Sequence, residues 1–133
     1  MSKSYNNIIP IFGEEKNIRK KIMSIVTDSA DVDEPKDINT PIFQLYSHFL
    51  HEDEQKHLKE RFLKPGLKYG DLKNEFFECF WEYFRPFREK REYLNNNMDY
   101  VFNSLDNGAK KASIVADEFL SKAKSSMGLH YKN

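Results

Sequence analysis

The sequence predicts an all-α fold, a bundle of about five helices preceded by a short extended segment, and three observations support this. From Gly13 onward, apolar residues recur at steps of three and four, the period of one helix face. Strand signals are nearly absent, because the only β-like run is residues 8–12, where Pro10 would confine a strand to a sheet edge. Aromatic residues make up 14% of a chain of 133 residues, which provides bulky core material and argues against disorder.

The first helix is expected over about residues 14–26, with one apolar face formed by Ile18, Ile22, Ile25 and Val26. An acidic connection, residues 28–39, follows it. Thr40 and Pro41 then form an N-cap and a proline at the first helical position, which predicts a short second helix. A third helix is expected to begin at about residue 51, because three acidic residues in its first turn suit the helix dipole.

The longest apolar element is expected to begin near residue 71. It carries two apolar stripes, one formed by Leu72, Phe76, Cys79, Phe80, Tyr83 and Phe87, the other by Phe77, Trp81 and Phe84. A helix that is apolar on two faces is normally central to a bundle, so we expect this element to be the centre of the core. Pro86 is expected to kink or interrupt it.

The last helix is expected from about Met98 to Met127, with Gly128 as its C-terminal cap. Its alanines follow steps of three and four, so we expect them to pack closely against the aromatic side chains of the preceding element.

Composition excludes several classes of function. Lys plus Arg equals Asp plus Glu at 21 each, so a nucleic-acid site would have to be a local patch. The single cysteine, Cys79, cannot form an internal disulfide, which predicts a reducing, cytoplasmic location. No apolar run approaches the roughly 20 residues that span a bilayer, so no membrane association is expected. The four histidines do not form a metal set, and no metal site is predicted.

Two basic clusters are the strongest candidates for a binding site. Arg85, Arg88 and Arg91 lie within two turns, interleaved with aromatic residues, and Lys73 belongs to a second cluster. Guanidinium groups suit phosphates, and aromatic rings can stack on unpaired bases. The residues alone leave two interpretations open, a solvated helix face or an RNA site. No catalytic constellation is visible in the pattern.

A resemblance goes further than the pattern. Met1-Ser2-Lys3-Ser4 resembles the last four residues of the Lys-Met-Ser-Lys-Ser signature of class I aminoacyl-tRNA synthetases. The blocks that continue it are similar, in order and spacing, to the bacterial-type tryptophan–tRNA ligase family over essentially the whole chain. The clearest of them are Ile11-Phe12-Gly13-Glu14-Glu15-Lys16, Thr27-Asp28-Ser29, Tyr69-Gly70-Asp71-Leu72-Lys73, Gly108-Ala109-Lys110-Lys111-Ala112 and Met127-Gly128-Leu129.

The resemblance implies an enzyme that activates L-tryptophan with ATP and Mg²⁺ and then charges tRNA(Trp). Lys3 would be the signature's second lysine, a catalytic residue that stabilises charge on the phosphates. Met1, Ser2 and Ser4 would belong to the same nucleotide-binding loop. Residues 1–13 are then expected to be a remnant of the catalytic domain's signature loop, and residues 14–133 the helical anticodon-binding domain. Without the nucleotide-binding domain, the chain is expected to bind no ATP and to be inactive alone.

The resemblance also predicts the partners. Arg85, Arg88, Arg91 and Lys73 are expected to contact phosphates or bases of the tRNA, and Asp71 to accept a hydrogen bond from a base. The full-length enzyme is expected to be a homodimer. Other interpretations are a stand-alone helical RNA-binding or interaction module, a purely structural bundle, and a fragment of the related tyrosine enzyme. The ending soon after Met127-Gly128-Leu129 favours tryptophan over tyrosine.

Overall fold

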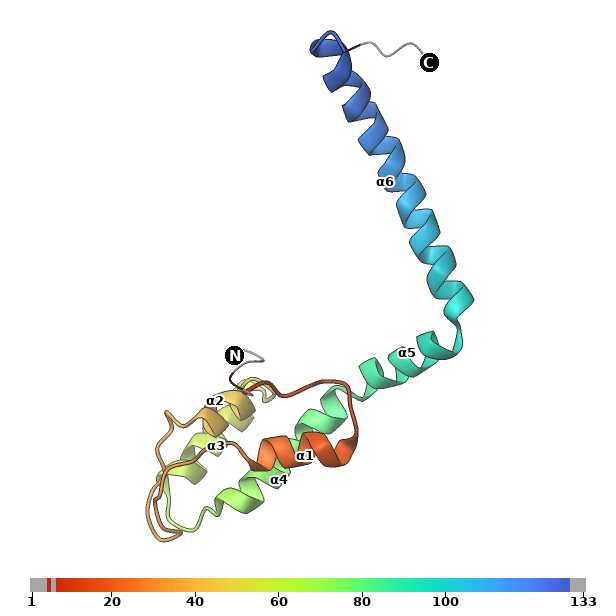
Figure 1. Cartoon of the computed structure of the whole chain (residues 1–133). Helices are drawn as coiled ribbons and strands as arrows, with labels where there is room; N and C mark the ends of the chain where they lie inside the picture. The colour runs from red at the N-terminus through yellow and green to blue at the C-terminus, as the bar shows by residue number, and fades with distance from the viewer. Residues whose placement is uncertain (1–4, 6, 130–133) are drawn as a thin grey trace. The chain divides into compact units, whose positions relative to one another are not determined.

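The computed structural model describes residue 5 and residues 7–129, and these residues form six α-helices and no strand (Figure 1). The chain divides into two compact units, one up to Arg88 and the other from Glu89 onward. The all-α prediction is confirmed. Residues 7–13, predicted as a short extended segment, precede the first helix without regular secondary structure and end in a bend at residues 11–13.

Helix α1 (Glu15–Met23) ends three residues earlier than predicted. The Ser24 amide caps the helix by donating to the carbonyls of Lys20 and Lys21, and its hydroxyl also donates to the Lys21 carbonyl at 2.7 Å. A serine that satisfies the last carbonyls in this way favours a helix end over another turn. Ile18 and Ile22 are buried as predicted, but Val26 lies beyond the helix and is 80% exposed, so its predicted place on the apolar face is wrong.

Helices α2 (Pro41–Ser47) and α3 (Glu52–Leu63) lie close to their predicted positions. Pro41 occupies the first turn of α2, where its missing N–H breaks no helical hydrogen bond. The first turn of α3 is acidic, and the Glu54 carboxylate accepts a hydrogen bond from the His51 amide at 2.9 Å. Both helix starts are therefore set by local chemistry that the sequence displays.

Helix α4 (Tyr69–Tyr83) is the centre of the first unit's core, as predicted. Its buried residues are Leu72, Phe76, Phe77 and Phe80. Helix α1 packs against it, Ile42, Leu58 and Phe62 join the buried cluster from α2 and α3, and Leu67 joins it from the loop before α4. The ring of Phe49 contacts four aromatic rings of this region, those of Phe76, Phe80, Tyr83 and Phe84, at centroid distances of 5.2–5.9 Å. Tyr83 and Phe87 were predicted to lie on the apolar stripe that begins at Leu72. They are instead 58% and 55% exposed, so the buried part of this stripe ends at Phe80.

The predicted interruption near Pro86 is confirmed. Helix α4 ends at Tyr83, Phe84 follows it as a cap, and α5 (Arg85–Asn96) begins at the next residue. Pro86 thus lies in the first turn of α5, where a proline is tolerated, and not inside a continuous helix, where it would remove a hydrogen bond.

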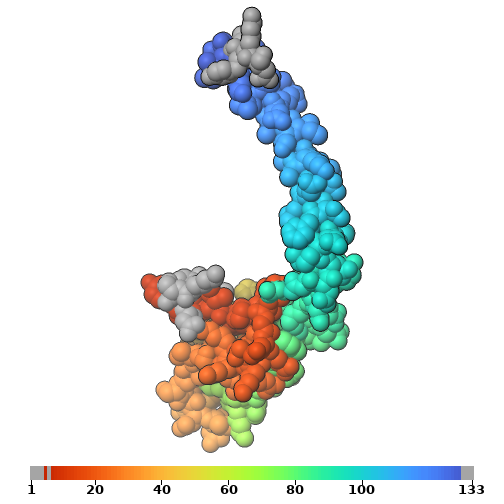
Figure 2. All heavy atoms as spheres, turned by 45° about the vertical axis from the view of Figure 1, so that its right-hand side comes forward, coloured from red at the N-terminus to blue at the C-terminus, as the bar shows by residue number. Residues whose placement is uncertain are grey.

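Helix α6 (Met98–Ser126) has 29 residues, and Gly128, two residues after its end, adopts a positive φ of 69°. The Leu129 amide donates to the Lys124 carbonyl at 2.9 Å, which completes the predicted glycine cap. None of the residues of α6 is buried, and the packing of its alanines against the aromatic helix stays a prediction. Its side chains, cyan to blue in Figure 2, lie on the surface of the second unit.

In the described part of the chain, no helix is both long enough and apolar enough to cross a membrane.

Candidate nucleic-acid interface

Apart from Arg91, which belongs to the second unit, the predicted site residues fall into three groups along the chain. Met1, Ser2, Lys3 and Ser4 lie outside the described residues, so their predicted roles at the nucleotide remain predictions. The other two groups lie at the two ends of α4: Asp71 and Lys73 near its start, and Arg85 and Arg88 just after its end. A helix rises 1.5 Å per residue, so roughly 20 Å separates these ends. Within the first unit, the structure does not gather them into one site.

Lys73, near the start of α4, is held against the end of α1. Its Nζ donates to the carbonyl of Met23 at 3.3 Å, where α1 ends. The side chain is half-buried, and this burial lowers the pKa of its ammonium group from the usual 10.5. A partly desolvated cation gains more from an anionic partner than a fully hydrated one. Asp71 lies two residues earlier, exposed in the first turn of α4.

The side chain of Arg88, on α5, packs against Trp81 on α4. Its guanidinium carbon lies 3.5 Å from the centroid of the Trp81 ring, and its Nη2 donates to the Trp81 carbonyl. The other terminal nitrogen, Nη1, is buried and has no hydrogen-bond partner within the described chain. Cation–π stacking and a charge-assisted hydrogen bond therefore fix this side chain against the end of α4.

Arg85 and Arg91 are more open to solvent. Arg85 pairs with Glu82 at 2.8 Å, and both side chains are more than half exposed, so the pair contributes little to stability. Arg91 is exposed and belongs to the second unit. Of the three predicted arginines, these two are exposed and Arg88 is half-buried.

Two further arginines of the first unit bind carboxylates within the fold. Arg61 makes two parallel hydrogen bonds to Glu75, at 2.7 and 2.8 Å, and joins α3 to α4. Arg19 contacts Glu78 at 2.6 Å and Asn74 at 2.9 Å, and its guanidinium lies over the ring of Phe77. These side chains hold α1, α3 and α4 together, which sequence spacing could not reveal because their partners are far along the chain.

A polar network fixes the acidic connection before α2. Lys36 is 3% exposed, and its Nζ donates to the carbonyls of Ala30 and Asp31. The Tyr69 hydroxyl donates to Asp28 at 2.8 Å. Burial alone would raise the pKa of the Asp28 carboxyl, but hydrogen bonds from Tyr69 and two backbone amides, with the charge of Lys36, lower it overall. The sequence predicted only a connection here, because the partners of these polar groups are not local to the stretch.

No group of three or more metal-ligand side chains occurs among residue 5 and residues 7–129. Cys79 is half-buried, and burial raises the pKa of its thiol, so the reactive thiolate form is disfavoured.

Comparison with known proteins defines the class. The family described as tRNA synthetases class I (W and Y) matches residues 1–85, more than half of the chain, and the chain belongs to this family.

The relatives narrow the similarity to one branch. The chain is 46% identical over 129 residues to the tryptophan–tRNA ligase of Fusobacterium nucleatum, and 44% identical over 130 residues to that of Rhodopirellula baltica. Each comparison covers 97% of this chain but only 40% or 41% of the relative, so the chain spans about two fifths of the length of these ligases.

The fold is similar to a solved structure of the same branch. The crystal structure of tryptophanyl-tRNA synthetase from Campylobacter jejuni complexed with ADP and tryptophan matches with a TM-score of 0.90 and 42% identity. The match covers 97% of this chain and 41% of the other chain. The resemblance to tryptophan–tRNA ligases that the sequence motifs indicate is confirmed.

Proposed function

We propose that this chain is the helical C-terminal part of a tryptophan–tRNA ligase, and that its role is to bind tRNA(Trp). The observation that carries the proposal is the identity of 42–46% with ligases of this name over 97% of the chain. A fold match with a TM-score of 0.90 supports it independently of the sequence motifs.

The whole enzyme would join tryptophan to ATP as tryptophanyl-adenylate and then transfer the tryptophanyl group to tRNA(Trp). ADP and tryptophan in the Campylobacter jejuni structure support these two substrates. Lys3 would act on the ATP phosphates as a positioned cation, with Met1, Ser2 and Ser4 shaping the same loop. Mg²⁺ would accompany the ATP, and we place its binding with the nucleotide outside the helical part. We also propose a cytoplasmic homodimer for the whole enzyme.

The exposed apolar face of α6 supports the proposal that this chain is part of a larger protein. Most of its apolar side chains follow one stripe at steps of three and four, which contains Met98, Val101, Phe102, Leu105, Ala109, Ala112, Ala116, Phe119, Leu120 and Ala123 and continues to Met127 just after the helix. Leu105, Phe119 and Met127 are each more than 60% exposed. A stripe of this length is normally covered, and the remaining three fifths of the ligase's length is the candidate to cover it.

The tRNA surface proposed for this part includes Lys73, Asp71, Arg85, Arg88 and Arg91. The partial desolvation of Lys73 supports its role as a phosphate contact. The exposure of Arg85 and Arg91 supports the same role for these two side chains. Arg88 is proposed to act chiefly by holding Trp81 at the end of α4. Alanine substitutions of Lys73 and Arg91 are expected to lower tRNA affinity and its salt dependence together, because each removes a phosphate contact. Unchanged binding in both variants would remove these residues from the site.

A chimera tests the proposal directly. This chain would replace the matched C-terminal two fifths of the Fusobacterium nucleatum ligase, and charging of tRNA(Trp) and of tRNA(Tyr) would be measured. We expect charging of tRNA(Trp) alone, and we expect Lys3→Ala in the chimera to lose it.

The isolated chain provides the control. In ATP–pyrophosphate exchange it is expected to give no signal above background, since it lacks most of the ligase's length. A folded chimera that charges no tRNA(Trp), or an isolated chain that forms the adenylate, would contradict the proposal.

A further inference from the structure

Four side chains from three helices stack on one another along α4. The rings of Phe77 and Trp81, one turn apart on this helix, stack with their centroids 5.9 Å apart and their planes at 21°. The guanidinium carbon of Arg19, on α1, lies 4.4 Å from the centroid of the Phe77 ring. That of Arg88, on α5, lies 3.5 Å from the centroid of the Trp81 ring. We name these four side chains the Arg19–Arg88 stack.

The Arg19 end of the stack is fixed against the core. The Arg19 guanidinium also donates to Asn74 at 2.9 Å and to Glu78 at 2.6 Å, and both of these residues lie on α4. The ring of Phe77 between them is fully buried. Residues three and four apart on a helix are neighbours, so Asn74, Phe77 and Glu78 present one surface to Arg19. Stacking and hydrogen bonding together therefore fix Arg19, and with it α1, against α4.

Helix α5 depends on the other end of the stack. None of its 12 residues is buried, and a helix of this length is marginal in water without tertiary contacts. Arg88 lies in its first turn, where it both stacks on Trp81 and donates to the Trp81 carbonyl. In the same turn, Arg85 makes an exposed ion pair, and the 55% exposed ring of Phe87 lies 5.9 Å from that of Phe84. Of these contacts, the stack is expected to hold the turn most firmly, because it adds a charge-assisted hydrogen bond to a cation–π contact.

We propose that Arg19 is a positioning residue, which acts through the rings of Phe77 and Trp81 to fix the first turn of α5 by way of Arg88. The inference rests on the proposed function in one respect, since Arg85, the first residue of this turn, is a proposed tRNA contact. Arg19 itself needs no contact with the tRNA. It holds the ring pair in place, and the ring pair holds the helix that carries Arg85.

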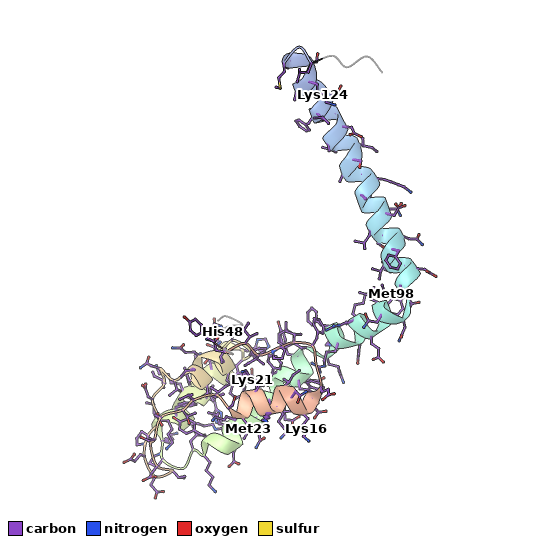
Figure 3. The ribbon with its side chains drawn as sticks, in the orientation of Figure 1. Lys16, Lys21, Met23, His48, Met98 and Lys124 are labelled. Carbon is purple, nitrogen blue, oxygen red and sulfur yellow. The ribbon has the colours of Figure 1, made fainter. Side chains whose placement is uncertain are left out.

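The fluorescence of Trp81 tests the stack directly, because this residue is the only tryptophan of the chain. The variants are Arg19→Lys and Arg88→Lys, which keep the charge and remove the planar group that stacks on a ring. Glu78→Gln is the matched control at α4, because it weakens the ion pair of Arg19 and leaves the stack. Lys16→Ala is the control on α1, because Lys16, labelled in Figure 3, is exposed and lies one turn before Arg19.

In the whole chain, we expect emission at longer wavelength and stronger quenching by acrylamide in Arg88→Lys, and a smaller change of the same kind in Arg19→Lys. Lys16→Ala and Glu78→Gln should leave the signal of Trp81 unchanged. Hydrogen exchange of ¹⁵N-labelled chains measures the consequence for α5. Its amides should exchange about three- to tenfold faster in the two lysine variants, which matches the loss of one partly buried cation–π contact. The amides of α3 should keep their protection, which shows that the first unit remains folded.

The chimera with the Fusobacterium nucleatum ligase connects the stack with charging. Arg19→Lys should raise the KM for tRNA(Trp) by about three- to tenfold, since the surface that carries Arg85 is less well positioned. The rate of ATP–pyrophosphate exchange should stay unchanged, because the adenylate forms without tRNA. The same substitution at Lys16 should change neither value.

Two results would overturn the inference. If Arg19→Lys leaves both the fluorescence of Trp81 and the exchange of α5 unchanged, the stack transmits nothing to α5. If it raises the KM for tRNA(Trp) without any change at Trp81, Arg19 contacts the tRNA directly. Either result leaves the proposed function standing, which fails separately if the unsubstituted chimera folds and does not charge tRNA(Trp).

Discussion

The two units of this chain carry the same kind of helical pattern and use it differently. In the first unit, the apolar faces of α1 to α4 meet, and side chains such as Phe62, Phe76 and Phe77 are fully buried. In the second, α6 has an equally regular apolar stripe, yet none of its residues is buried. Amphipathic periodicity indicates that one face of a helix packs against another apolar surface. It does not indicate where that surface lies.

The difference has an energetic meaning. Burying a large apolar side chain contributes on the order of 1.5–3 kcal/mol, and the first unit obtains this at ten buried positions. The stripe of α6 obtains it only when another surface covers it. We therefore expect the stability of the isolated chain to depend on the first unit, and the stripe of α6 to matter in the whole ligase.

The largest expected effect comes from Phe76→Ala. The ring is fully buried and contacts the rings of Tyr46, Phe49 and Phe80, so its removal should lower the free energy of unfolding by about 3–5 kcal/mol. Urea denaturation followed by circular dichroism measures the change. The matched control is Phe119→Ala on α6, where the ring is 68% exposed and the change should stay within about 0.5 kcal/mol. Equal losses of unfolding free energy in the two variants would contradict the difference in burial between the two units.

A smaller effect is expected at the Arg61–Glu75 pair. Glu75→Gln weakens two charge-assisted hydrogen bonds between α3 and α4, and after allowance for solvent screening it should cost about 1 kcal/mol. The corresponding change in α6, Glu118→Gln, disrupts a pair with Lys122 that is exposed and local to one helix, so about 0.3 kcal/mol is expected. Denaturation at low and high salt measures both changes. A larger loss for Glu118→Gln would show that the pair between helices is not the stronger one.

Tyr69 should give the first unit a dependence on alkaline pH. Burial, the hydrogen bond to Asp28 and the charge of Asp28 together raise the pKa of its hydroxyl above the usual 10.0. The neutral phenol is therefore favoured in the folded state, so its stabilisation is complete below pH 10 and is lost as the pH rises through the folded pKa.

In Tyr69→Phe, the free energy of unfolding should accordingly fall less steeply above about pH 10 than in the unchanged chain. Tyr100→Phe on α6 is the control, because the side chain is 57% exposed and lies outside the first unit's core. Denaturation midpoints of the three proteins, measured between neutral and alkaline pH, test this expectation. Parallel curves for Tyr69→Phe and the unchanged chain would rule out this contribution.

The smallest effect is expected for Leu105→Ser in the isolated chain. Leu105 is 64% exposed, so the free energy of unfolding should change by less than about 0.5 kcal/mol. In the chimera with the Fusobacterium nucleatum ligase, the same substitution should lower thermal stability by several degrees, because the stripe is then covered. Ser104→Ala, one residue away on the polar side of the stripe, is the control. An unchanged chimera would show that α6 is not covered by the rest of the ligase.

Much of the candidate site was predictable from sequence only as positions and not as geometry. Lys73, Asp71, Arg85, Arg88 and Arg91 stand out as polar or charged residues in motif blocks, and all lie on helices as predicted. That Arg88 stacks on Trp81 was not predictable, because cation–π contact depends on the turn that Phe84 introduces between two helices. The end of α1 was missed as well, because the period of the sequence placed Val26 inside a helix that stops at Met23.

By itself the sequence determined where the helices lie and how most of them begin and end. Pro41, the acidic first turn of α3, Pro86 and Gly128 act within a turn of their own positions, so their consequences can be deduced locally. Tertiary structure alone decided which apolar faces are buried and which cations are engaged. Arg19 pairs with Glu78, which lies 59 residues further along the chain, and no residue of α6 is buried. The sequence displays the side chains involved in both cases, but not their neighbours in space. Burial and ion pairing depend on distance in space, which a linear pattern does not contain.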